Sequence, residues 1–157
     1  MKIKRATPVL FVDSVAASRD FFVRIGFTAT VEIPDGNALG FVILERDGVQ
    51  VMLESRDNAN EPAAIRSKSK QACASHVFIE VDDLGAVIGA LGRVEVVVER
   101  HKTFYNSDEL TCLEPGGHLI TFAQFACRRP RSRSTASPRR STPRRPVTSS
   151  TTPTSRA

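Results

Sequence analysis

Residues 7–15 read TPVLFVDSV, and the same pattern returns at residues 76–84 as HVFIEVDDL. The spacing between the two segments is 69 positions, and at this spacing the segment 47–53, DGVQVML, falls on 116–122, GGHLITF. Two separated segments that repeat in register at one spacing are typical of a duplicated module. The sequence therefore predicts two copies of a module of about fifty residues arranged around a shared cleft.

Both copies predict the same order of elements. In the first copy, an apolar strand over 7–12 precedes a helix that is capped by Asp13 or Ser14 and ends near Gly26. The strands expected after this helix lie at 27–33, 39–46 and 49–55. The elements expected in the second copy are a strand at 76–81, a helix at 83–91 and strands at 94–99, 109–113 and 118–125. We therefore predict an α+β fold in which two βαβββ modules form a curved mixed sheet around a cleft.

The composition divides the 157 residues into a domain and a basic tail. Residues 1–127 carry 13 Lys and Arg and 17 Asp and Glu, a net charge of −4, whereas residues 128–157 carry nine Arg and no acidic residue. We expect a folded domain over 1–127, with modules at about 5–55 and 75–126, a polar linker at 56–74 with at most a short helical turn, and a disordered tail. Only this tail could contact nucleic acid, and it has no aromatic residues to stack on bases, so we do not expect a nucleic-acid partner.

Nothing in the sequence indicates a membrane protein or a secreted protein. No apolar run approaches the length of a transmembrane helix, and the apolar run near the N-terminus is too short for a signal peptide. The three cysteines, Cys73, Cys112 and Cys127, show no CxxC spacing, and their odd number does not favour a disulfide framework. These features predict a cytoplasmic protein with no membrane partner.

Alternation along the expected strands separates a helix-facing set of side chains from an inner set. The more uniformly aliphatic set, which includes Val12, Val49, Leu53 and Phe122, should pack on the helices. His118 falls in the helix-facing register at a strand end and should be structural. The inner set mixes large apolar with polar side chains: Thr7, Phe11, Met52, Glu54, His76, Phe78 and Thr121. Such a surface suits a small-molecule cleft, and it also suits a half-exposed sheet face that binds nothing specific.

Three features together resemble a known family, the vicinal oxygen chelate superfamily. They are the paired βαβββ modules, the opening helix with FF at 21–22 and GF at 26–27, and the closing EPGGHLITFAQF at 114–125. This superfamily includes glyoxalase I, extradiol dioxygenases, fosfomycin-resistance enzymes and bleomycin-resistance proteins. The resemblance covers about residues 5–126 and implies U-shaped sheets that enclose a cavity, and a homodimer.

The resemblance also implies where a metal ion would be held, on the first and last strand of each module. In this sequence these positions are Thr7, Met52, His76 and Thr121, and only His76 suits a divalent metal. We therefore expect no metal and no cofactor, and a protein of the bleomycin-resistance-like branch that sequesters a small molecule. The alternative is a metal-dependent lyase, isomerase or dioxygenase with a shifted site of His76, Glu54 and Glu80, so catalysis stays open.

Nine residues form the predicted ligand site: Thr7, Phe11, Met52, Glu54, His76, Phe78, Phe104, Tyr105 and Thr121. Phe104 and Tyr105 precede the seventh expected strand and could stack on a planar ligand, or simply pack within their loop. His76 could be a polar anchor or a general base, or a hydrogen-bonded strand histidine. Glu54 and Glu80 could fix a cationic ligand, or lie on a solvated sheet face.

Overall fold

The structure is a computed structural model that describes residues 2–71 and 74–126. All of these residues belong to one compact unit, Met1–Cys127. The predicted disordered tail lies outside the described residues, as do Cys73 and Cys127. No helix in the described part of the chain is long and apolar enough to cross a membrane.

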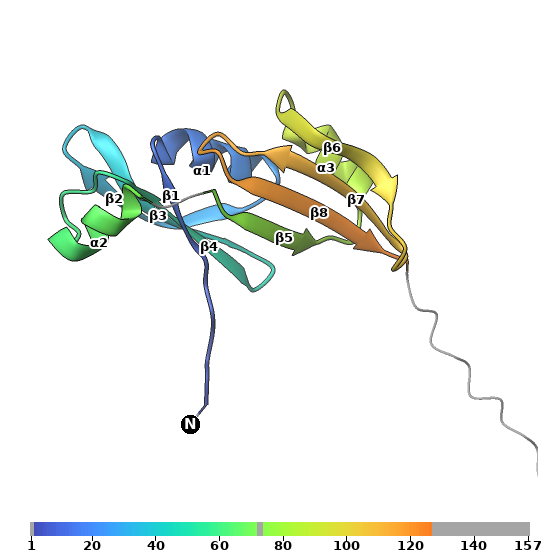
Figure 1. Cartoon of the computed structure of the whole chain (residues 1–157), viewed down its shortest axis with the longest axis horizontal. Helices are drawn as coiled ribbons and strands as arrows, with labels where there is room; N and C mark the ends of the chain where they lie inside the picture. The colour runs from blue at the N-terminus through green and yellow to red at the C-terminus, as the bar shows by residue number, and fades with distance from the viewer. Residues whose placement is uncertain (1, 72–73, 127–157) are drawn as a thin grey trace, which may run out of the picture. The chain divides into compact units, whose positions relative to one another are not determined.

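The first module is a four-stranded sheet with one covering helix (Figure 1). Its elements are β1 (Val9–Val12), α1 (Val15–Arg24), β2 (Thr28–Asp35), β3 (Ala38–Arg46) and β4 (Val49–Ser55). The strand order is β1-β4-β3-β2, in which β1 runs parallel to β4 and the other pairs are antiparallel. The segment between the modules contains a short helix, α2 (Ala63–Ser69), where the sequence predicts at most a helical turn.

The second module repeats this arrangement. Its elements are β5 (His76–Glu80), α3 (Leu84–Leu91), β6 (Glu95–Lys102), β7 (Ser107–Leu113) and β8 (Leu119–Phe125). The strand order is β5-β8-β7-β6, and β5 runs parallel to β8. The α+β class and both βαβββ modules are confirmed. Each module forms its own four-stranded sheet, and β1 and β5 are edge strands that no described ladder joins.

Both covering helices begin at side-chain caps that occupy equivalent positions in the repeat. Ser14 Oγ accepts a hydrogen bond from the N–H of Ala17 at 3.3 Å, and Asp83 Oδ1 accepts one from the N–H of Ala86 at 3.0 Å. Such caps satisfy backbone donors that have no partner within the helix. The first helix stops before Gly26, whose φ of 93° lies in the region that favours glycine.

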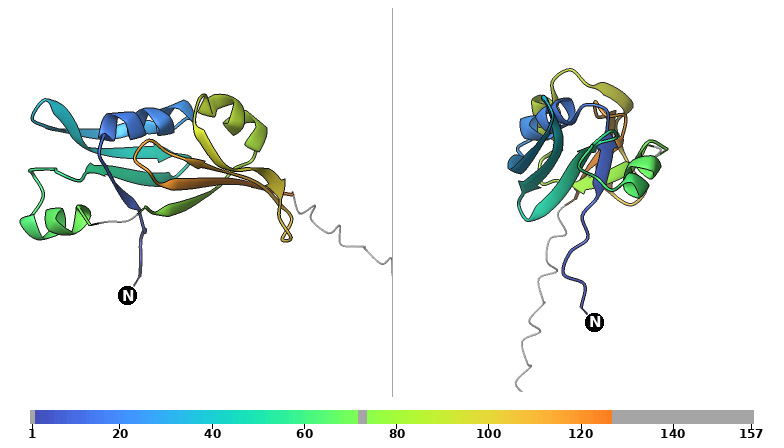
Figure 2. Two further views of the ribbon diagram at one scale, coloured as in Figure 1. Left: turned by 45° about the horizontal axis from the view of Figure 1, so that its top comes forward. Right: turned by 90° about the vertical axis from the view of Figure 1, so that its left-hand side faces the viewer.

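The core lies between the sheets and the helices α1 and α3, which cover the same side of the sheets (Figure 2). The helix-facing strand residues in this core are Leu10, Val12, Val42, Leu44, Val51, Leu53, Leu110, Cys112, Ile120 and Phe122. Helix α1 adds Phe21 and Phe22, whose rings pack edge to face with centroids 5.2 Å apart. The predicted helix-facing set is confirmed at Val12, Leu53 and Phe122 and is wrong at Val49, which is 50% exposed.

Candidate functional site

A chain of hydrogen bonds crosses the inner face of the second sheet. His76 Nε2 lies 2.7 Å from Thr121 Oγ1, which in turn lies 2.7 Å from Thr111 Oγ1. Thr111 on β7 stands directly opposite Thr121 on β8. Both threonines are buried, whereas His76 is exposed. The inner face therefore presents an accessible imidazole that a buried pair of hydroxyl groups holds in place.

A buried carboxyl group, which the sequence did not single out, lies on the same face. Glu109 on β7 is only 6% exposed, and its Oε1 accepts hydrogen bonds from Tyr105 Oη at 2.6 Å and from Ser107 Oγ. The bond to Glu109 raises the pKa of the Tyr105 phenol, because a phenolate there would stand beside a carboxylate. The sequence assigns 109–113 to a strand, and pairing Thr111 with Thr121 would have placed Glu109 on the inner face.

Four aromatic rings gather on the second sheet and in the turn that follows β6. The ring centroids of Phe78 and Phe125 are 6.4 Å apart, those of Tyr105 and Phe125 are 6.3 Å apart, and those of Phe104 and Tyr105 are 4.9 Å apart. Phe104 is 96% exposed and Phe78 is 49% exposed. These four residues, which we call the aromatic cluster, present ring faces and edges on which a planar molecule could stack.

The inner face of the first sheet is more apolar. Buried Glu54 lies on β4 between two phenylalanines, Phe11 on β1 and Phe41 on β3. Its Oε1 accepts a hydrogen bond from Asn58 Nδ2 at 3.4 Å. Burial, and then the negative charge of Glu61, raises the pKa of the Glu54 carboxyl group.

The nine predicted site residues form two groups. Thr7, Phe11, Met52 and Glu54 belong to the first sheet or the segment leading into it, whereas His76, Phe78, Thr121, Phe104 and Tyr105 belong to the second module. Within the described residues, no hydrogen bond or ring contact joins the two groups. The two sheets do not close on each other (Figure 1), so the two groups of predicted residues belong to separate modules.

The four positions at which the resemblance implies metal ligands do not fit a divalent metal ion. Thr7 Oγ1 donates to Gln50 Oε1 at 3.1 Å, and His76 and Thr121 are bonded to each other. A threonine hydroxyl and a methionine thioether are poor donors for such an ion. Among residues 2–71 and 74–126, no three His, Cys, Asp or Glu side chains are grouped to hold a metal ion. The shifted set of His76, Glu54 and Glu80 therefore does not come together in one chain.

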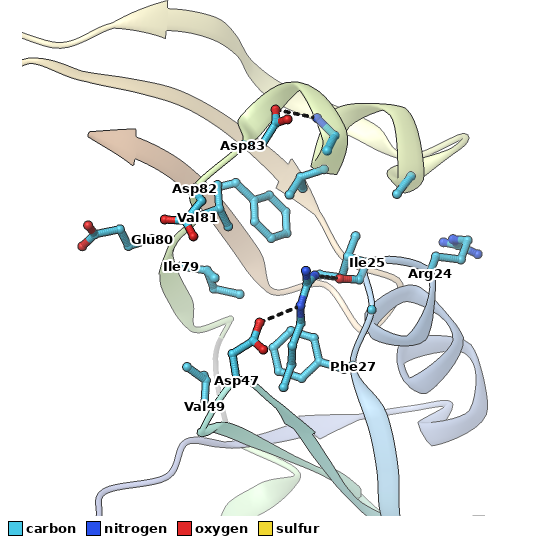
Figure 3. A pocket seen from close by; sticks show the side chains of 16 residues that line it. Arg24, Ile25, Phe27, Asp47, Val49, Ile79, Glu80, Val81, Asp82 and Asp83 are labelled. Carbon is cyan, nitrogen blue, oxygen red and sulfur yellow. Dashed lines mark hydrogen bonds and ion pairs between the residues drawn. The ribbon is translucent and has the colours of Figure 1, made fainter. Parts of the chain in front are cut away.

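A groove of about 600 Å³ lies elsewhere, where the two modules meet (Figure 3). It is bounded by the end of α1, the turn between β3 and β4, the end of β5, and α3. None of the nine predicted residues lines it. Its chemistry is therefore separate from that of the inner sheet faces.

His118 lies at the other place where the modules meet. It is buried, and its Nε2 lies 3.0 Å from the carbonyl oxygen of Phe11. The structural role that the sequence predicts for His118 is confirmed.

The family model of the Glyoxalase/Bleomycin resistance protein/Dioxygenase superfamily matches residues 2–122. The chain belongs to this superfamily. The match covers both modules and ends within β8. A search of curated protein sequences gave no match.

Solved structures of the superfamily fold are similar to this chain. TioX from Micromonospora sp. ML1 has a TM-score of 0.63 at 17% identity, over 79% of this chain and 100% of TioX. A bleomycin-binding protein in complex with bleomycin has a TM-score of 0.55 at 17% identity, over 79% of this chain and 100% of that protein. A bleomycin resistance determinant from the transposon Tn5 has a TM-score of 0.56 at 17% identity, over 78% and 98% of the two chains. These similarities establish the shared fold.

Proposed function

We propose that this superfamily member binds a small molecule with a planar aromatic part on the inner faces of its sheets, without a metal ion, and withholds it from its target. The observation that carries the proposal is the exposed aromatic cluster beside the hydrogen-bonded chain of His76, Thr121 and Thr111. Exposed rings gain buried apolar area when a planar ligand stacks on them. A few fixed polar groups then set the orientation of the ligand.

The known ligand of a protein with this fold supports a binding role. One of the similar structures is that of a bleomycin-binding protein that holds bleomycin. This chain shares the fold and the superfamily with that protein. A large organic ligand is therefore compatible with the proposed role.

Acidic side chains on the inner faces favour a ligand that carries positive charge. Glu109 and Glu54 are buried, and no ion pair joins either carboxyl group to a basic side chain among the described residues. A buried carboxylate that gains a cationic partner forms a charge-assisted contact, which is stronger than one between neutral groups. The net charge of −4 over residues 1–127 acts in the same direction.

We further propose that the protein works as a homodimer in which each copy covers an inner face of the other. Large apolar residues are exposed on both sheets, for example Val31 at 40%, Ile33 at 43% and Phe78 at 49%. Exposed apolar patches of this kind are typical of interaction surfaces. Sedimentation of the full chain is expected to give twice the mass of 17.2 kDa, and a monomer at micromolar concentration would contradict this arrangement.

Metal content of the purified full chain tests the proposed function against a metal enzyme of the same superfamily. We expect wild type and His76→Ala to contain the same substoichiometric trace of Mn, Fe, Ni and Zn. Stoichiometric metal in the wild type that is lost in His76→Ala would contradict binding without a metal and would favour a metal-dependent lyase, isomerase or dioxygenase. The comparison is clean because His76 is exposed and its loss should leave the core intact.

A further inference from the structure

The two modules meet at two equivalent turns, and one of these junctions is closed. At the turn between β7 and β8, the N–H of Ser75 donates to His118 Nδ1 at 2.9 Å. Because Nδ1 accepts this bond, the ring proton lies on Nε2, which donates to the carbonyl oxygen of Phe11 at 3.0 Å. Gly116 packs against Val12 so closely that a Cβ at position 116 would overlap the valine side chain. The ring of His118 therefore fills this junction.

The equivalent junction is open. At the repeat spacing of 69 positions, Val49 corresponds to His118 and Glu80 corresponds to Phe11. Val49 is 50% exposed and has no side-chain N–H to donate. The groove of about 600 Å³ lies here, with both Val49 and Glu80 in its lining (Figure 3). It thus occupies the position that an imidazole fills at the other junction.

The lining of the groove combines an apolar floor with an acidic rim. The apolar residues that both modules contribute to it include Ile25, Phe27, Ile79, Val87 and Phe122. At the rim, Asp82 is exposed, and within the described part of the chain no hydrogen bond or ion pair engages its carboxylate. The side chain of Glu80 points away from the groove (Figure 3). Arg46 also lines the groove, but its Nε is paired with Asp47 at 3.2 Å and its Nη1 donates to a backbone carbonyl group. The rim therefore keeps unpaired negative charge.

We infer that this groove is a second binding site, which takes a small organic cation: an ammonium or guanidinium group on an apolar body. The apolar body would lie on the floor, and the charged group would face Asp82. The N–H groups of the cation would donate to the backbone carbonyl group of Glu80. His118 Nε2 donates to the backbone carbonyl group of Phe11 in the same way at the closed junction. Charge complementarity with the rim selects a cation over a neutral molecule of the same shape. The site is independent of the inner sheet faces.

A titration of the ¹⁵N-labelled full chain, followed by NMR, tests this inference with two matched probes. Phenethylamine is a cation at neutral pH, and 2-phenylethanol is a neutral molecule of similar size. We expect phenethylamine to shift the amide signals of Gly48, Asp82 and Ala86, which lie in or next to the groove. The dissociation constant of the alcohol should be at least about fivefold higher, as expected for the loss of one or two exposed charge contacts.

Two variants and one matched control complete the test. Ala86→Leu adds volume to the groove from the exposed face of α3 and should weaken phenethylamine binding at least about tenfold. Asp82→Asn should weaken it roughly two- to fivefold. Ala17→Leu is the control, because Ala17 is the repeat equivalent of Ala86, is exposed on α1 and does not line the groove. It should bind phenethylamine as the wild type does.

Three results would overturn the inference. Equal dissociation constants for phenethylamine and 2-phenylethanol would show that the positive charge does not contribute to binding. Unchanged affinity in Ala86→Leu would place the probe elsewhere, and signal shifts confined to Phe78 and Thr121 would assign it to the inner sheet face. Each variant must retain the wild-type amide dispersion, so that lost binding is not confused with lost folding.

Discussion

The two modules have nearly the same helix-facing side and different inner sides. At the repeat spacing, Leu53 corresponds to Phe122, and both are fully buried against the helices. One position earlier on the same strands, Met52 corresponds to Thr121, and only the threonine belongs to a hydrogen-bonded chain. The difference teaches that one set of alternate strand positions specifies the fold, while the other set is free to differ in chemistry.

The largest loss of stability is expected from substitutions at the helix-facing pair, Leu53 and Phe122. Leu53→Ala and Phe122→Ala should each lower the free energy of unfolding by about 2–5 kcal/mol, because both create a cavity in the core. Urea unfolding of the two variants measures this directly. If either substitution lowers the free energy of unfolding by less than about 1 kcal/mol, the helix-facing positions of the two modules are not packed equivalently.

Substitutions in the two turns where the modules meet, between β7 and β8 and between β3 and β4, should differ in their effect on stability. His118→Ala removes a buried ring with hydrogen bonds from Ser75 and to Phe11, and leaves the backbone groups of both unpaired. The expected cost is about 2–3 kcal/mol, whereas Val49→Ala at the equivalent exposed position should cost less than about 1 kcal/mol. Thermal unfolding of His118→Ala and Val49→Ala shows which variant loses more stability. Equal losses of stability would contradict the account in which the junction at His118 is closed and the junction at Val49 is open.

The buried carboxyl group of the first sheet should make stability depend on pH. Since the folded-state pKa of Glu54 lies above its ordinary value of 4.5, the folded state binds more protons than the unfolded state through this group. Its contribution is present below pH 4.5 and is lost as the pH rises through the folded-state pKa. Glu54→Gln should therefore remove part of the decline in the free energy of unfolding over that window.

Urea unfolding at several pH values checks this, with Glu80→Gln as a control on an exposed carboxyl group. If both variants follow the wild-type pH profile, the environment that we assign to Glu54 is wrong.

A smaller effect, a change in the pKa of Tyr105, is expected at the aromatic cluster. Tyr105 is the only tyrosine and the chain has no tryptophan, so the ultraviolet absorbance of the phenolate reports this residue alone. Glu109→Gln should lower the pKa of Tyr105 towards its ordinary value of 10.0, because the hydrogen bond to Glu109 is the main cause of its raised value. An unchanged titration midpoint would contradict the bond between these side chains.

Local sequence signals were sufficient to predict most of the fold. Alternation at Val12, Leu53 and Phe122 identified the helix-facing side, and the capping residues before each helix marked where the helices begin. The repeat at 69 positions predicted two modules but could not show that β1 and β5 do not pair with each other, since edge pairing depends on long-range geometry.

The candidate site was harder to predict than the fold. His76 and Thr121 were predicted from the superfamily pattern, but Glu109 was missed because its inner-facing position depends on the register between β7 and β8. The open groove also escaped prediction. It depends on Val49 being exposed, whereas periodicity alone assigned this side chain to the core.

Native mass spectrometry of the full chain tests the central proposal most directly, with two variants at equivalent, exposed inner-face positions. Wild type, Phe78→Ala and Val9→Ala are treated with a metal chelator and incubated with a small-molecule extract of the producing cells. We predict an organic adduct on the chelated wild type and on Val9→Ala that is lost from Phe78→Ala. No adduct on the chelated wild type, or one that forms only after a divalent metal is restored, would contradict ligand binding by the aromatic cluster without a metal ion.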